Sequence, residues 1–317
     1  MRMRSIAAGL LATALAAHAP AGDVAAAADK ATEVVAAARK AIGDKKLDAL
    51  RTLSIEASVQ RNMNNMQMTS DVEILLDLPD KYIRSDQSSG PMAMGYSVGF
   101  VGARPIRPPN ASPAGGGMMM IRIGPGGPMP GPEKKLTPEE QEQLDKQLLR
   151  TARTDISRLM LGWFASVHPS VEAQFTYAGE AESPDGKADV IDAKSADGFS
   201  ARLFVDRETR LPLMVSYQGP QPRAITIGGP PPAGARGAQN REPSEAERRT
   251  AIAAAEKQLA APAPMVEITV FFDDWRDVSG VKFPHKMRRA TAGTTNEEWT
   301  VTKVKVNPKL DPKKFEG

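Results

Sequence analysis

The sequence predicts an α+β protein built on a curved antiparallel β-sheet, an incomplete, half-open β-barrel with helices packed on its concave face. Two observations lead to this fold class. Apolar and polar residues alternate in many segments, which indicates strands with one apolar and one wet face. Two longer segments carry apolar residues at helical spacing instead, and helices laid on one face of an antiparallel sheet make a layered α+β fold.

The first residues have the features of an export signal. A basic start, MRMR, precedes the uncharged apolar run Ser5–Ala17, and Ala19 and Ala21 place small residues where a signal peptidase cleaves. The run is too short to span a bilayer, which takes about 20 residues. We therefore expect a signal peptide over residues 1–21, cleaved near Ala21, and a soluble periplasmic protein.

Composition narrows the classes of partner. The 317-residue chain has no cysteine, so neither disulfides nor a cysteine lipid anchor are expected, and no later segment has the length of a membrane span. Of 41 Lys and Arg against 38 Asp and Glu, two basic residues lie in the leader, which leaves 39 against 38. A near-neutral chain argues against a nucleic-acid partner. Residues 22–317 are expected to form one domain with two inserts.

A helix and a pair of strands follow the leader. Asp29–Ile42 carries apolar residues at helical spacing, and Gly43 follows it as a C-terminal cap. From Leu53 to Val59, and again through ILLDLP, every second residue is apolar, which is the strand pattern. PDKYIRSD then predicts a turn into a further strand.

Two Pro- and Gly-rich inserts interrupt the strand pattern, at residues 88–132 and 219–264. The composition of the first insert predicts no regular element, and loops of that length are commonly functional or disordered. Thioethers suit Cu(I), but no His or Cys accompanies the methionines of this insert, so a flexible insert is favoured over a copper site. These methionines are Met92, Met94, Met118, Met119 and Met120. In the second insert, Ser244–Leu259 predicts a charged helix.

Leu136–Ser166 carries the clearest helix signal of the chain. Thr137 suits the N-cap, Pro138 suits the first helical position, and acidic residues follow. Apolar residues recur at three- and four-residue spacing, at Leu144, Leu148, Ala152, Ile156, Leu159, Met160 and Trp163. The strongly apolar end, LMLGWF, should be buried or should face a cavity.

Strands resume after this helix. Segments that begin at Ala173, Phe199 and Leu213 alternate, and residues 266–306 contain three more strands. The apolar phase changes within the last of these strands, which predicts a bulge near Thr302.

Candidates for catalysis are few. His168 and His285 are the histidines of the mature chain, and the nucleophile-elbow, zinc-protease and phosphate-loop motifs are absent. His285 alternates with apolar neighbours and is expected to be a satisfied core residue. Asp273 and Asp274 are adjacent and close to a turn, and adjacent strand residues point to opposite faces, so the two cannot easily share a proton or a metal. No catalytic residue, metal or cofactor is expected.

A curved sheet with one apolar face can enclose a space that an apolar ligand fills. A fully packed core would show the same periodicity, so both alternatives stay open. For a cavity, the expected lining on the sheet is Ile55, Ile74, Leu76, Phe175, Phe199, Leu203, Val215, Ile268, Val270 and Phe272. The expected lid is the long helix, with Leu148, Ile156, Met160 and Trp163.

The segment FDDWRDVSGVKFPHKMRR resembles the hairpin near the C-terminus of outer-membrane lipoprotein-sorting proteins of the LolA-like family. The matching positions are Asp274, Trp275, Arg276, Val278, Gly280, Val281, Phe283 and Pro284. LFVDRETRLPLMV is similar to a strand–turn–strand of that family, at Val205, Asp206, Thr209, Leu211 and Pro212. ILLDLPDKYIRS and EEWTVTKVKVNPKLDPKKFE are similar to its early hairpin and its closing strand. The resemblance covers most of Asp29–Gly317 outside the inserts.

This resemblance implies a curved, incomplete β-barrel closed by helices, with an apolar cavity for acyl chains. It implies a non-enzymatic periplasmic carrier or binder of lipid or of acylated lipoprotein. Relatives with this fold also act as envelope-stress sensors, so the second hypothesis is a cell-envelope sensor or scaffold that binds another protein through the inserts. No integral membrane span and no nucleic-acid partner are expected.

Overall fold

The computed structural model describes residues 21–63, 66–88, 95–107, 120–123, 137–183, 186–221, 224–227 and 263–316. The chain divides into two compact units. The first unit takes its described residues from 1–111, 145–218 and 267–317, and the second takes them from 112–144 and 219–266. The second unit includes a two-stranded parallel sheet of β6 (Met120–Ile123) and β11 (Ala224–Ile227). The expected signal sequence before Ala21 and the helix expected at Ser244–Leu259 lie outside the described residues.

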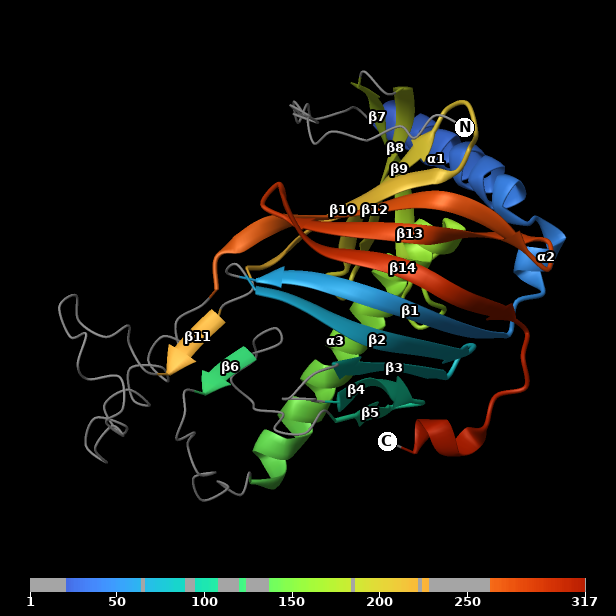
Figure 1. Ribbon diagram of the computed structural model, residues 1–317. Coiled ribbons are helices and arrows are strands. Elements are labelled where there is room, and N and C mark those ends of the chain that lie inside the picture. The colour runs from blue at the N-terminus through green and yellow to red at the C-terminus, as the bar shows by residue number, and fades with distance from the viewer. Residues whose placement is uncertain are drawn as a thin grey trace. The chain divides into compact units, whose positions relative to one another are not determined.

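The first unit is built on one open antiparallel sheet of twelve strands (Figure 1). From edge to edge the strands are β5 (Arg104–Ile106), β4 (Gly95–Val101), β3 (Lys81–Ser88), β2 (Met66–Asp77), β1 (Thr52–Met63), β14 (Thr294–Val306), β13 (Val281–Thr291), β12 (Met265–Val278), β10 (Pro212–Pro220), β9 (Ser200–Asp206), β8 (Gly186–Ser195) and β7 (Ala173–Ser183). Strands β7 to β9 turn steeply away from the direction of β1 to β3 in Figure 1, so the sheet is strongly curved. Its edge strands β5 and β7 are not neighbours, so the barrel stays incomplete and the predicted fold class is confirmed.

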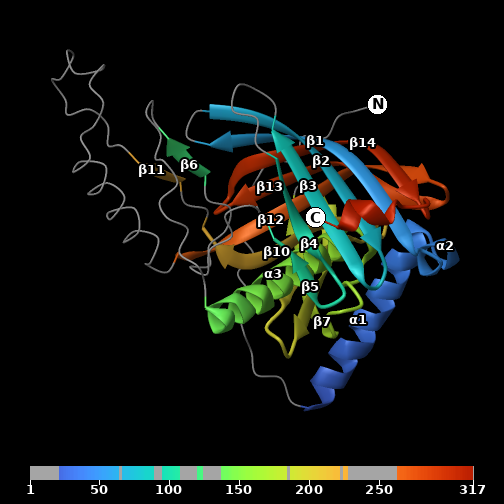
Figure 2. The ribbon, with the colours of Figure 1, turned by 90° about the horizontal axis from the view of Figure 1, so that it is seen from below.

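The helices lie against one face of this sheet. They are α1 (Ala21–Ile42), the short α2 (Lys45–Asp48) and α3 (Pro138–Phe164). The 3-10 helix η1 (Pro312–Phe315) lies on the opposite face, where Phe315 packs with Leu75 and Ile83. Within the first unit, α3 crosses the sheet obliquely and α1 lies beside β7 (Figure 1, Figure 2). We call the face that α1 and α3 cover the inner face and the opposite one the outer face.

The start of α3 follows the sequence expectation. The Glu140 backbone N–H donates to Thr137 Oγ1 at 3.2 Å, and the Thr137 N–H donates to Glu140 Oε2 at 2.9 Å. This reciprocal pair is a capping box, which satisfies two backbone donors that the first turn leaves free. The predicted N-cap at Thr137 and the helix that follows it are confirmed.

Strand pairing explains why the alternating residues form a continuous apolar layer. Leu53 lies opposite Leu76 and Ile55 lies opposite Ile74 across the β1–β2 pair, and all four side chains are buried. In the β1–β14 pair the register shifts after Glu56, which leaves Thr302 without an opposite residue. The predicted bulge at Thr302 is therefore confirmed, and it keeps the apolar residues on both sides of it on the inner face.

The prediction that residues 88–132 hold no regular element is wrong for part of the segment. Gly95–Val101 and Arg104–Ile106 form strands β4 and β5 at one edge of the main sheet. Gly99 faces Ile83, and a Cβ at Gly99 would lie 2.0 Å from the Tyr82 carbonyl oxygen, so the glycine permits a close approach of β4 to β3. Two of the glycines of this segment, Gly95 and Gly99, are thus part of a strand.

The placement of Asp273 and Asp274 next to the hairpin turn is also wrong. Strand β12 continues through both residues to Val278, and the turn is Ser279–Gly280, where both residues have positive φ. The chain is instead irregular at Asp274, whose φ is 56°.

Candidate ligand-binding face of the sheet

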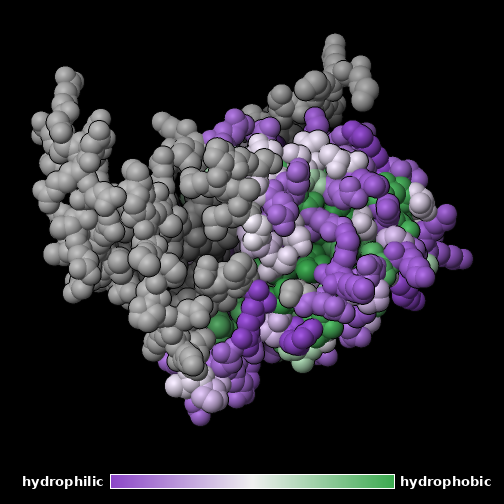
Figure 3. Space-filling view, turned by 60° about the horizontal axis from the view of Figure 1, so that its bottom comes forward, coloured by the Kyte–Doolittle hydropathy of each residue, from purple (hydrophilic) through white to green (hydrophobic). Residues whose placement is uncertain are grey.

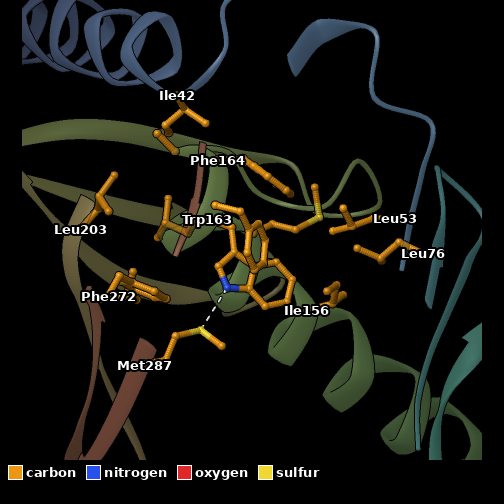
Figure 4. Packing of buried hydrophobic residues seen from close by; sticks show 14 of the residues in the cluster. Ile42, Leu53, Leu76, Ile156, Trp163, Phe164, Leu203, Phe272 and Met287 are labelled. Carbon is orange, nitrogen blue, oxygen red and sulfur yellow. Dashed lines mark hydrogen bonds between the residues drawn. The ribbon is translucent and has the colours of Figure 1, made fainter. Parts of the chain in front are cut away.

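The main core fills the space between α3 and the inner face. Trp163 and Phe164 at the end of α3 are buried (Figure 4). Both contact Phe283 of β13, with ring centroids 5.2 and 6.1 Å apart. The Trp163 indole N–H donates to Met287 Sδ at 3.2 Å. A Cβ added at Gly162 would lie 1.9 Å from the Phe272 ring, so helix and sheet are in direct contact there. At this end of α3, protein side chains occupy the space that an acyl chain would need.

The structure brings most of the expected lining residues together in this core. Those buried in the same cluster on the sheet are Ile55, Ile74, Leu76, Phe199, Leu203, Val215 and Phe272. Ile268 is buried outside the cluster, whereas Val270 and Phe175 are partly buried against it. Whether these side chains bind a ligand stays a prediction.

The lid residues of α3 are placed less uniformly. Ile156, Met160 and Trp163 are buried in the cluster, but Leu148 is only half-buried and Leu149 packs against the cluster beside it. Leu161 and Phe164, which the helical stripe did not include, are fully buried. The apolar run LMLGWF was the signal for them, because a helix end that is apolar on every side must be covered on every side.

Three polar contacts hold the N-terminal half of α3 to neighbouring turns and strand ends. Arg107, which follows β5, forms a bidentate ion pair with Asp145, with N–O distances of 2.9 and 2.7 Å. Arg150 donates to the Asp197 carbonyl in the β8–β9 turn. Arg153 donates to the Gly102 carbonyl in the β4–β5 turn at 3.3 Å. These contacts lie at the rim, so most of the interface under α3 is apolar.

Beyond the apolar core, the inner face ends in a buried ion-pair network around Asp86 of β3. Asp86 accepts hydrogen bonds from Arg61 at 2.9 Å, Arg84 at 2.9 Å, Ser70 at 3.1 Å and Tyr96 at 2.9 Å. Burial alone would raise the pKa of Asp86, but the charges of Arg84 and Arg61 and the hydrogen bonds it accepts lower it below its ordinary value. The four hydrogen bonds that Asp86 accepts thus favour its ionised form.

A second carboxylate closes the same network from β14. Glu297 accepts a hydrogen bond from the Trp299 indole N–H, and its oxygens lie 3.5 Å from Arg61 Nε and 4.0 Å from Arg84 Nη2. The Arg84 guanidinium also stacks over Trp299 at 4.8 Å. Sequence reasoning missed this network. The available signal was phase, because Arg61 continues the buried alternation of β1, and Arg84 and Asp86 continue that of β3 after Tyr82.

The histidines serve packing. His285 is buried, as predicted, and its Nδ1 lies 3.0 Å from the Phe283 carbonyl oxygen. His168 is fully buried against the Phe100 ring, and its Nδ1 contacts Ser170 Oγ at 2.8 Å. Burial, assisted by the charge of Arg153, lowers the pKa of His168 to about 4.

Other classes of site find little support in the described part of the chain. Its His, Asp and Glu residues form no group of three that could hold a metal ion. None of the described helices combines the length and the apolar character that a bilayer crossing requires. Met92, Met94, Met118 and Met119 lie outside the described residues, as does the side chain of Met120, so the copper hypothesis stays untested.

Two surface hollows of the first unit lie away from α3. One, of about 390 Å³, is lined by polar residues of the outer face, among them Glu56, Asp71 and Glu73. The other, of about 380 Å³, lies between α1 and β7, and its lining includes Val35 and Phe175. Figure 3 shows one face of the molecule, on which apolar residues appear as small patches between polar ones.

Comparisons with known proteins concern the fold. The sequence matches no protein-family model and no curated protein. In structure the chain is similar to a LolA superfamily protein from Nitrosomonas europaea, at a TM-score of 0.47 and 10% identity over 90% of this chain and 97% of that one. It is also similar to an outer-membrane lipoprotein-sorting protein domain from Vibrio parahaemolyticus, at a TM-score of 0.41 and 11% identity over 91% of this chain and 97% of that one. A DUF1329 family protein from Desulfovibrio piger is similar at a TM-score of 0.40 and 11% identity, over 93% of this chain and 97% of that one.

Proposed function

We propose that the protein is a non-enzymatic periplasmic carrier that binds the acyl chains of a lipid or of an acylated protein on the inner face, with α3 as the lid. The observation that supports this proposal is a continuous apolar layer across the sheet that the helices α1 and α3 cover. Ile55, Ile74 and Leu203 belong to this layer, and each is fully buried.

The protein with α3 packed on the sheet and the protein with an acyl chain in its place should have similar free energies, so that one can replace the other. Lifting the end of α3 would expose Ile156, Met160, Leu161, Trp163 and Phe164, which are buried now. At about 1.5–3 kcal/mol for each side chain, this exposure costs roughly 10 kcal/mol. A chain of about 14 methylenes contributes about 11 kcal/mol when it is buried, at about 0.8 kcal/mol for each. An acyl chain can therefore replace α3 on the same apolar surface.

The position of Trp163 provides the test. The chain has 3 tryptophans, so the W275F/W299F double variant leaves Trp163 as the single emitter beneath α3. Titration with a long-chain fatty acid should change the Trp163 emission, because binding moves the indole away from Phe283 and Met287. The matched control is the W163F variant, whose remaining tryptophans lie on the sheet.

Mass spectrometry of lipids extracted from the purified protein complements this titration. We expect acyl lipids to co-purify with the native chain. Absence of bound lipid, together with an unchanged Trp163 emission at saturating fatty acid, would overturn the proposal.

A further inference from the structure

Two arginines beside the ion-pair network of the inner face lack hydrogen-bond partners. Arg158 projects from α3 and Arg289 from β13, and the Nε atom of each is buried without a hydrogen-bond acceptor among the described residues. Arg158 stacks over the Tyr217 ring with its Cζ 3.8 Å from the centroid. Unsatisfied buried N–H groups are costly, so a pair of them at one place needs an explanation.

Two carboxylates beside this pair neutralise it only in part. Glu297 lies opposite Arg289 in the β13–β14 pair, but its oxygens are also 3.5 Å from Arg61 and 4.0 Å from Arg84. Asp155 Oδ1 lies 3.6 Å from Arg158 Nη1, beyond hydrogen-bond distance. Burial and the nearby charge of Arg289 lower the pKa of Arg158, although Tyr217 and Asp155 oppose this shift. Four arginines, Arg61, Arg84, Arg158 and Arg289, thus share the three carboxylates Asp86, Glu297 and Asp155, which leaves one positive charge.

This charge is accessible from solvent and borders the apolar layer. The Asp155 side chain is 56% exposed, so the group opens to the outside there. Arg289 lies opposite Val270 of β12, and Met287, which contacts Trp163, lies two residues along the same strand. Residues two apart on a strand share a face and lie about 7 Å apart. A headgroup at Arg289 and a chain on the apolar layer can therefore belong to one molecule.

We propose that Arg158 and Arg289 bind the oxyanion headgroup, a carboxylate or a phosphate, of an amphiphile whose chain lies on the inner face. This inference rests on the proposed function and deepens it, because it selects anionic lipids over neutral ones. The planar guanidinium fork offers two parallel N–H donors to such a group, a geometry that an ammonium lacks. Arg61 and Arg84 differ from this pair, because each donates a hydrogen bond to Asp86.

The test compares a long-chain fatty acid with its methyl ester, which has the same chain but no charge. Wild type, R158Q/R289Q and the control R202Q are titrated with both, and thermal melts check that each variant folds. Arg202 is a suitable control because it forms an ion pair with Asp192 on the outer face, at 2.7 Å. Loss of charge-assisted hydrogen bonds should weaken fatty-acid binding by R158Q/R289Q about ten- to a hundredfold. Methyl-ester binding should stay unchanged, and R202Q should behave as wild type.

Each other outcome is informative. Equal weakening for acid and ester would overturn the headgroup assignment and leave the carrier function standing. Failure of wild type to bind either amphiphile would overturn the carrier function. If inorganic phosphate then still binds wild type and not R158Q/R289Q, the pair takes free oxyanions and not lipid headgroups. If the glutamine variant does not fold, R158K/R289K replaces it, since lysine keeps the charge but lacks the fork, and unchanged fatty-acid binding by that variant would contradict the assignment.

Discussion

Gly162 is the position where the contact between α3 and the sheet is tightest, and G162A is the sharpest perturbation of it. An added Cβ would lie 1.9, 2.2 and 2.7 Å from three carbons of the Phe272 ring. Carbon atoms in contact lie about 3.5–4 Å apart, so the ring or the helix must move by roughly 2 Å. The ring cannot turn away freely, because Phe272 is buried and lies opposite Met287.

Two opposing terms set the magnitude. Alanine is about 1 kcal/mol better than glycine in a helix interior, which favours the variant. Overpacking a core costs about 1–3 kcal/mol, and more where a backbone has to shift. The added Cβ would lie roughly 2 Å closer to the Phe272 ring than carbon atoms in contact normally do. We therefore expect the steric clash to outweigh the gain in helix propensity. G162A should lower the free energy of unfolding by about 1–3 kcal/mol.

Urea unfolding of the two single variants and the double variant tests this reasoning. F272A alone should cost about 3–5 kcal/mol, as truncation of a buried phenylalanine does. In the F272A background the clash is gone, so G162A should become stabilising, by about 1 kcal/mol from helix propensity. If G162A destabilises the wild-type and the F272A protein equally, then the clash is not with Phe272 and the close contact between Gly162 and Phe272 is refuted.

Three further predictions concern stability. D86A should cost about 3–5 kcal/mol in urea unfolding, because it leaves the two buried charges of Arg61 and Arg84 to share Glu297 alone. A loss below about 1 kcal/mol would contradict the buried network. T137A removes half of the capping box and should cost about 1 kcal/mol, and an unchanged urea midpoint would argue against the cap. The pKa of His168 is about 4 in the folded protein, so as pH falls from about 6.5 towards 4 the histidine becomes protonated in the unfolded chain but stays neutral in the folded chain. This difference should lower the free energy of unfolding by up to about 3 kcal/mol, and H168Q should show a weaker pH dependence of stability. An equally steep dependence in H168Q would assign the effect to other groups.

Local patterns in the sequence predicted much of the fold. Period-two alternation located β1, β2 and the β12–β14 meander, and the change of apolar phase predicted the bulge at Thr302. Thr137 and Pro138 predicted where α3 begins. Each of these features depends on residues that are close in the sequence, so a single sequence is enough to reveal them.

The features that sequence reasoning missed depend on distant residues or on unusual composition. Strand β4 was hidden because its glycines, Gly99 among them, permit a close approach to β3 that only the pairing reveals. Arg61 and Asp86 form an ion pair across 25 positions of the chain. Charged side chains are usually assigned to the wet face of a strand, so their burial becomes visible only when the partner strands are known.

We proposed that an acyl chain enters under α3, and a reversible cross-link between α3 and the sheet tests this directly. The Arg107–Asp145 ion pair joins the end of β5 to α3, and the native chain has no cysteine, so R107C/D145C can be joined specifically by a short cleavable bis-maleimide. The control is E56C/K303C, which replaces an outer-face ion pair between β1 and β14 and leaves α3 free.

Fatty-acid binding is measured with the cross-link intact and again after it is cleaved. We expect the α3 cross-link to slow or abolish binding, cleavage to restore it, and the outer-face cross-link to have no effect. Equal binding by the α3-linked protein before and after cleavage would show that the acyl chain does not enter beneath α3.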